Sequence, residues 1–121
     1  MANQSHILVV EDDPLVSDVV VEALDGIYQT SCADTAAAAL ECLRVGGIDA
    51  ILLDCTLPGG IHPHLMPMAD ESRVPVILMS GHPETAERMA GANRPFILKP
   101  FSLNALLATI ENAIQPLNHR G

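Results

Sequence analysis

Short apolar runs alternate along the chain with segments in which apolar residues recur every three or four positions. Continuous apolar runs are typical of strands buried on both faces of a parallel sheet, and the second spacing is typical of helices with one buried face. Five strands are predicted, at His6–Val10, Ile27–Cys32, Asp49–Leu53, Val74–Met79 and Phe96–Leu98. Strands that alternate with helices in this way predict an α/β fold with a doubly wound, five-stranded parallel sheet.

The first predicted helix has signals at both ends. Asp13 can cap it, Pro14 suits its first turn, and Gly26 ends it. Apolar side chains at helical spacing are expected to form its buried face: Leu15, Val16, Val19, Val20 and Leu24.

Three further helices are predicted from similar signals. Asp34 is expected to cap an alanine-rich helix that runs to about Val45, and Pro83 opens a short helix after the fourth strand. Ser102 is expected to cap the last helix and Pro116 to end it. The buried stripe of that last helix consists of Leu103, Leu106, Leu107, Ile110 and Ile114.

The segment Gly59–Arg73 departs from the regular pattern. A helix is due there, but Pro63 and Pro67 interrupt it. We therefore expect this helix to be short or distorted.

Length and charge narrow the function classes. The 121 residues suffice for one compact domain, expected over 1–121 with 116–121 as a C-terminal tail. Fifteen acidic residues against six scattered basic ones give a formal charge of −9, which argues against direct nucleic-acid binding. No apolar run approaches the roughly 20 residues that span a bilayer, and no leader peptide pattern is present. The expected location is therefore cytoplasmic, without membrane contact.

Cysteine and histidine residues do not form a recognisable metal-binding pattern. Cys32, Cys42 and Cys55 lack CxxC spacing and are expected to be reduced and partly buried. His62 and His64 have no third ligand nearby in sequence, so they are expected to be exposed to solvent.

Polar side chains follow four of the predicted strands. They are Glu11, Asp12 and Asp13 after the first strand, Asp54 after the third, Ser80 after the fourth and Lys99 after the fifth. Ligands of doubly wound sheets gather outside the carboxyl ends of the strands, so these side chains should lie close together. Converging carboxylates need a cation, and oxygen ligands with open water positions favour Mg²⁺ over zinc. We therefore expect Mg²⁺ as the cofactor.

Lys99 is the only lysine in the chain, and it stands between apolar residues at the end of a strand. A partly buried ammonium requires an anion, and an ion pair with Asp54 or Asp12 would be enough for a structural role. In a functional interpretation Lys99 also binds a phosphoryl oxygen. With the hydroxyl of Ser80, these groups fit phosphoryl transfer to a carboxylate, with Asp54 as the nucleophile.

The strand-end residues belong to four short stretches: Leu8–Pro14, Asp54–Gly59, Met79–Gly81 and Lys99–Phe101. In this order and spacing they resemble the signature stretches of response-regulator receiver domains, the phospho-aspartate switches of two-component signalling and phosphorelays. The resemblance covers nearly the whole chain and implies the flavodoxin-like (βα)5 receiver fold.

The resemblance also implies roles for individual residues. Asp54 would accept the phosphoryl group, with Lys99 and Ser80 completing the catalytic set. The implied Mg²⁺ ligands are Asp12 and Asp54 directly, Glu11 directly or through water, and the backbone carbonyl of Thr56.

Two further pairs of residues receive roles from the same resemblance. Ser80 and Phe96 would act as the switch residues, while Thr56 and His82 would tune the rate of dephosphorylation. The family also implies a cis peptide bond at Lys99–Pro100, where proline makes that isomer accessible.

Two regions depart from the common receiver pattern. The segment after Pro58 is compact and broken by prolines, and eighteen residues separate Ser80 from Lys99, which makes the intervening helix short. Such compact receivers are similar to those of hybrid histidine kinases or stand-alone relay proteins. The sequence leaves both arrangements open.

Two other functions share parts of the pattern. An aspartate-nucleophile phosphatase would need a second carboxylate two residues after Asp54, where this chain has Thr56. A flavodoxin-type flavin binder would need a glycine- and hydroxyl-rich phosphate loop and aromatic rings, but Tyr28, Phe96 and Phe101 are the only aromatic residues. The chain is therefore expected to be a switch that catalyses only its own phosphorylation and dephosphorylation.

Partners follow from this interpretation. A histidine kinase or histidine phosphotransfer protein is expected upstream and a protein target downstream. The surface available for self-association is formed by the last strand and the helices before and after it.

Overall fold

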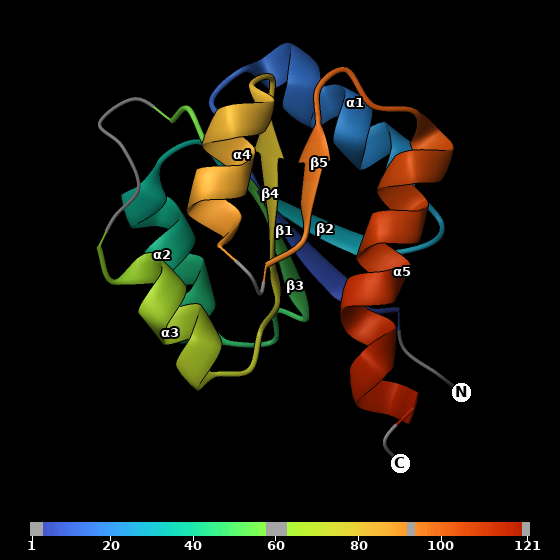
Figure 1. Cartoon of the computed structure of the whole chain (residues 1–121). Helices are drawn as coiled ribbons and strands as arrows, with labels where there is room; N and C mark the ends of the chain where they lie inside the picture. The colour runs from blue at the N-terminus through green and yellow to red at the C-terminus, as the bar shows by residue number, and fades with distance from the viewer. Residues whose placement is uncertain (1–3, 58–62, 92–93, 120–121) are drawn as a thin grey trace.

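The computed structural model describes residues 4–57, 63–91 and 94–119. One parallel sheet with strand order β2-β1-β3-β4-β5 lies between two layers of helices (Figure 1). The strands are β1 (His6–Val10), β2 (Gln29–Ala33), β3 (Ala50–Asp54), β4 (Val76–Ser80) and β5 (Phe96–Leu98). The helices are α1 (Pro14–Leu24), α2 (Ala36–Val45), α3 (Leu65–Glu71), α4 (Pro83–Ala90) and α5 (Leu103–His119). The predicted doubly wound α/β fold is confirmed.

Each central strand contributes to two hydrophobic cores because successive side chains point to opposite faces of the sheet. In β1, Leu8 and Val10 pack with α2 and α3, while Ile7 and Val9 pack with α1 and α5. Figure 1 shows these two helix layers on opposite sides of the sheet. Burial on both faces explains why the central strands are continuous apolar runs.

The first helix is less buried than its sequence pattern predicts. Val20 and Leu24 are buried, as expected, but Leu15 is 75% exposed and Val19 is 64% exposed. Both line an apolar groove of about 470 Å³ that the segment Lys99–Phe101 borders on its other side. The prediction for these two residues was wrong because their apolar face opens onto this groove rather than onto the sheet.

Two predicted helix ends also differ from the structure. Thr35, not Asp34, caps α2, because its Oγ1 accepts a hydrogen bond of 3.1 Å from the Ala38 N–H. The last helix passes through Pro116 and ends at His119, so the prediction that Pro116 ends it is wrong. Proline has a helical φ and removes only one backbone hydrogen bond, so a helix can continue through it.

The ends of the other elements mostly agree with expectation. Asp13 caps α1, with its carboxylate accepting from the Leu15 N–H at 2.9 Å. Ser102 likewise accepts from the Ala105 N–H at 3.0 Å. In contrast, β2 begins at Gln29, and Ile27 is exposed in the preceding turn.

The short helices α3 and α4 are confirmed, with seven and eight residues. Pro67 lies in the first turn of α3, where its missing N–H would have no helical partner in any case. Residues 58–62, including His62, lie outside the described residues, while His64 is exposed as expected.

The cysteines are free, but Cys32 is exposed rather than partly buried as predicted, because it lies on the edge strand β2. Cys42 and Cys55 are partly buried, as expected. In the described part of the chain, no helix is both long enough and apolar enough to cross a membrane.

Candidate functional site

The carboxyl edge of the sheet brings the predicted site residues together. Glu11 follows β1, Asp54 ends β3, Ser80 ends β4 and Lys99 follows β5, and these four strands are neighbours in the sheet. Backbone hydrogen bonds extend the ladder past the strand ends, from the Lys99 N–H to the Ser80 carbonyl at 2.8 Å, for example. The parallel register therefore fixes side chains that are distant in sequence along one edge.

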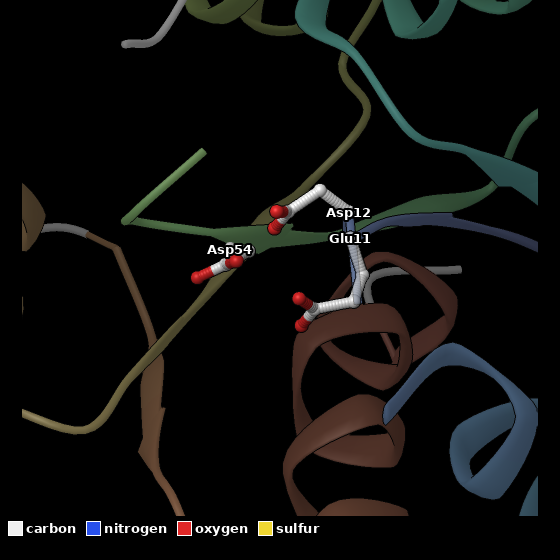
Figure 2. A group of neighbouring side chains, drawn as sticks. All are labelled: Glu11, Asp12 and Asp54. Carbon is white, nitrogen blue, oxygen red and sulfur yellow. The ribbon is translucent and has the colours of Figure 1, made fainter. Parts of the chain in front are cut away.

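Three carboxylates converge at this edge (Figure 2). Glu11, Asp12 and Asp54 each offer an oxygen, and these oxygens all lie within 4.8 Å of one another. Glu11 and Asp54 are buried, whereas Asp12 is exposed at the mouth. A set of carboxylate oxygens with one side open to water fits a hard divalent cation such as Mg²⁺. Asp13 has a different task, since its carboxylate caps α1.

Lys99 balances part of this negative charge. Its Nζ lies 2.9 Å from Glu11 Oε1 and 3.5 Å from Asp54 Oδ1. The ion pair suggested by the sequence therefore includes Asp54, as expected, but its closer partner is Glu11 and not Asp12. Burial lowers the pKa of Lys99, but the hydrogen bond to Glu11 and the charge of Asp54 outweigh burial and raise it above 10.5. Lys99 is therefore a fixed cation at neutral pH.

The Asp54 carboxylate is oriented by its own turn. Oδ1 accepts hydrogen bonds from the Thr56 backbone N–H at 3.0 Å and from the Thr56 hydroxyl at 2.9 Å. Burial acts to raise the pKa of Asp54, but hydrogen bonds, the Thr56 N–H foremost, together with the Lys99 charge lower it below 3.8. Asp54 is therefore ionised at neutral pH, as a nucleophile must be.

Burial has the opposite net effect on Glu11. It raises the pKa of the Glu11 carboxyl above 4.5 even though the Lys99 hydrogen bond acts against it. The neighbouring Asp54 charge acts in the same direction as burial. The cluster thus contains Asp54, which ionises readily, beside Glu11, whose negative charge is unfavourable even with Lys99 in contact.

Ser80 is fully buried, and its hydroxyl is engaged locally. It accepts a hydrogen bond of 2.9 Å from the His82 N–H and donates one of 3.1 Å to the His82 carbonyl. His82 is the residue at the N-cap position of α4. The hydroxyl therefore connects the carboxyl edge with the start of α4.

Phe96 lies on the edge strand β5, where it and Leu98 are 36% and 38% exposed while Ile97 between them is buried. The cis peptide bond at Lys99–Pro100 is confirmed. The switch role of Phe96 and the metal-binding role of the Thr56 carbonyl stay predictions.

Two features of the site were missing from the sequence prediction. The Thr56 hydroxyl contact with Asp54 was not predicted, although a hydroxyl residue two positions after an aspartate is a common turn arrangement that could have indicated it. The Glu11–Lys99 pair joins residues 88 positions apart, and no local sequence signal distinguishes Glu11 from Asp12 as the partner.

Comparison with known proteins agrees with this geometry. Residues 7–111 match the sequence profile of the response regulator receiver domain. The chain belongs to this family. The predicted flavodoxin-like receiver fold and the assignment to two-component signalling are thereby confirmed. Proteins of this family act as phospho-switches and bind Mg²⁺ at an acidic pocket.

Individual relatives show the contexts in which similar receiver domains occur. The chain is 34% identical to the transcriptional regulatory protein CseB of Streptomyces coelicolor, over 100% of this chain and 54% of the relative. It is 28% identical to the sensor histidine kinase TmoS of Ectopseudomonas mendocina, over 93% of this chain and 12% of that protein. This receiver domain thus spans about half the length of CseB and a small part of TmoS.

A solved structure provides a comparison at the site itself. The receiver domain of the sensor histidine kinase PA1611 from Pseudomonas aeruginosa PAO1 aligns with a TM-score of 0.79 and 27% identity, covering 93% of this chain and 98% of that chain. That structure contains a magnesium ion coordinated in its active-site cleft.

Proposed function

We propose that this receiver domain accepts a phosphoryl group on Asp54 from a phosphohistidine donor, in a Mg²⁺-dependent reaction. One observation carries the proposal: the buried Asp54 carboxylate lies in an oxygen cluster with Glu11 and Asp12 and 3.5 Å from the only lysine. Few other reactions use an ionised aspartate, a cation site and an ammonium in this arrangement.

The residues of the site have separate tasks in this reaction. An oxygen of Asp54 bonds to phosphorus as the phosphorus–nitrogen bond to the donor imidazole breaks, and the released nitrogen takes up a proton. The two Thr56 hydrogen bonds hold the carboxylate in one orientation. Lys99 and Ser80 bind oxygens of the transferred group. Glu11, Asp12, Asp54 and the Thr56 carbonyl would hold the Mg²⁺, which would neutralise negative charge on the phosphoryl group.

Ser80 couples the reaction to the surface of the domain. To donate to a phosphoryl oxygen, its hydroxyl must leave the His82 carbonyl that it contacts in the structure. That change alters the N-terminus of α4, the helix that packs next to β5. Phe96 on this strand is the proposed second switch residue, and His82 and Thr56 tune the lifetime of the phosphorylated state.

Exposed apolar side chains on two faces of the domain support the proposal that it binds protein partners there. The groove between α1 and Lys99–Phe101 borders the reaction site, because Lys99 is one of the residues that line it. A donor histidine kinase or phosphotransfer protein must bind next to this site, so the groove is the proposed donor surface. Phe96, Leu98 and Leu103 are exposed on β5 and α5, although Leu103 was predicted to belong to the buried stripe of the last helix. Their exposure supports α4-β5-α5 as the surface for a target or a second copy.

The cellular setting follows from the proposed reaction. The proposed location is the cytoplasm, together with the phosphohistidine donor. The domain acts either alone or as the receiver of a hybrid histidine kinase, and it catalyses only its own phosphorylation and dephosphorylation.

A small phosphorus–nitrogen donor tests this function without a known partner. The domain is incubated with phosphoramidate, with Mg²⁺ or with chelator, and its intact mass is measured. We expect one added phosphoryl group with Mg²⁺, little with chelator, and none in Asp54→Asn under either condition. Equal labelling of Asp54→Asn and the parent would refute the assignment.

A further inference from the structure

The strand β2 is the outermost strand of the sheet, with β1 on one side and no described strand on the other. In a parallel ladder, alternate residues direct both of their backbone groups toward the same neighbouring strand. The N–H of Gln29 and the carbonyl of Ala33 bond to the chain at the two ends of β1. Thr30 and Cys32 therefore direct their N–H and carbonyl groups away from β1, toward the free edge.

This edge lacks the features that usually protect an edge strand from pairing with another chain. Its residues, Gln29–Ala33, include no charged side chain and no proline, and their register with β1 is continuous, without a bulge. Cys32 is exposed and Thr30 is partly buried. The backbone edge is thus open to the approach of an extended chain.

The elements around this edge are strongly acidic. Residues 1–43, which include β1, α1 and β2, contain eight of the fifteen acidic residues and none of the six basic ones. Arg44, the first basic residue along the chain, forms an ion pair with Glu41 at 3.1 Å. The edge therefore lies in a negative field that no basic side chain of α1 or β2 offsets.

Asp18 on α1 is the acidic side chain best placed to act at the edge. Cys32 pairs in register with Val9, whose side chain packs with α1 and α5, so Cys32 faces the same helix layer. Burial, and then the negative charge of Asp18, raise the pKa of the Cys32 thiol, so this charge reaches the edge strand. Asp18 is exposed, and no ion pair in the described part of the chain includes it.

We propose that β2 binds an extended segment of a partner protein that carries lysine or arginine residues, and that this segment joins the sheet as a sixth strand. Backbone hydrogen bonds with Thr30 and Cys32 supply affinity, while Asp18 and Asp34 favour basic side chains. A hollow of about 420 Å³ opens beside Cys32 and is lined in part by Ser17 and Asp34. It gives room for one such side chain.

A second copy of this chain fits the edge less well than a basic segment does. Pairing two β2 edges brings together two surfaces with the same acidic excess, and like charges repel. The β2 edge is also distinct from β5, which lies at the opposite edge of the sheet. The inference therefore goes beyond the proposed function and does not depend on Asp54.

Two synthetic peptides test strand addition and charge preference together. One alternates lysine with valine over about six residues, and the other has glutamate in place of each lysine. The ¹⁵N-labelled domain is titrated with each peptide, and its amide signals are followed by NMR. We expect the lysine peptide to shift the Thr30 and Cys32 amides, slow their hydrogen exchange, and bind at least about tenfold more tightly than the glutamate peptide. The absence of shifts in β2, or equal binding of both peptides, overturns the proposal.

Two controls separate strand addition from general attraction to an acidic protein. Methylation of every backbone N–H in the lysine peptide keeps its charge but removes its donors, so binding should fall at least about tenfold. Asp18→Lys should weaken binding about fivefold, whereas Glu71→Lys, the same charge change at an exposed position of α3, should leave it within about twofold. A methylated peptide that binds as tightly as the original, or equal losses in the two variants, overturns the proposal.

Discussion

The hydroxyl of Thr56 donates a hydrogen bond of 2.9 Å to Oδ1 of Asp54, the same oxygen that accepts from the Thr56 backbone N–H. Both bonds favour the ionised form of Asp54, whose pKa is lowered. Thr56→Val replaces the hydroxyl with a methyl group of similar size, so the pKa of Asp54 should rise and the domain should lose roughly 1 kcal/mol of stability at neutral pH. The Asp54 carboxyl ¹³C signal, followed through an acid titration in chelator, reports this pKa.

Thr56→Ser is the matched control for this prediction, because it keeps the donor and loses a methyl group. It should titrate like the parent. A valine variant in which Asp54 titrates at the parent value would show that the backbone N–H alone orients and ionises the carboxylate.

The raised pKa of Glu11 predicts an unusual pH dependence for the metal-free domain. Between 4.5 and the raised pKa, the folded state holds more protons at Glu11 than the unfolded chain does. The free energy of unfolding should therefore increase as the pH falls through this window. In chelator, the melting temperature should be higher near pH 5 than near pH 7.

Glu11→Gln separates this effect from other titrations, since glutamine has nearly the same shape and no proton to gain. Its melting temperature should change less between the two pH values than that of the parent. The opposing loss of Asp54 stabilisation sets in from about pH 5 downward and is largest below 3.8, so it has little effect on a comparison of pH 5 with pH 7. If both proteins show the same pH dependence, the Glu11 carboxyl is not the group responsible.

Asp12 tests charge crowding and metal binding together. It is an exposed member of the acidic cluster, so Asp12→Ala should relieve repulsion and raise the melting temperature in chelator. The same change should reduce the stabilisation by Mg²⁺, which is about 2.7 kcal/mol at a hundredfold excess over the dissociation constant. Four thermal melts, of parent and variant with chelator and with Mg²⁺, give the comparison.

Asp18→Ala is the matched control for Asp12→Ala. It removes an exposed carboxylate on α1 outside the cluster. It should leave the Mg²⁺ increment at the parent value. An Asp12→Ala protein that melts lower than the parent in chelator and still gains as much from Mg²⁺ would show that the cluster is not a metal site.

Ser80 should stabilise the start of α4 before any phosphorylation. Ser80→Ala leaves the His82 N–H without its acceptor, so the free energy of unfolding should fall by about 1 kcal/mol, measured by urea denaturation. Hydrogen exchange of the His82 amide should become faster, while Ser80→Thr, which keeps the hydroxyl, should protect it. Unchanged exchange in Ser80→Ala would contradict the proposed link between this hydroxyl and α4.

The sequence predicts the sheet and the carboxyl-edge residues well because both depend on local patterns. A strand buried on both faces must be continuously apolar, and the polar residue that ends it then lies at the sheet edge. Asp54, Ser80 and Lys99 could therefore be located before the structure was known. The predicted cap of α2 was wrong by one residue, because Asp34 and Thr35 are both good capping residues.

The remaining differences between prediction and structure depend on tertiary contacts, which the spacing of apolar residues along the chain does not reveal. Leu15 and Val19 have the spacing of core residues, but whether they are covered depends on how Lys99–Phe101 runs past α1. The choice of Glu11 as the nearest partner of Lys99 depends in the same way on the positions of β1 and β5 across the sheet.

Mapping the phosphorylated residue tests the central claim most directly. After reaction with acetyl phosphate and Mg²⁺, borohydride reduces an aspartyl phosphate to homoserine, and peptide mass spectrometry locates the product. The account predicts homoserine at position 54 in the parent and no homoserine in Asp54→Asn. Homoserine at Asp12 or Asp13 in the parent, with Asp54 intact, would contradict it.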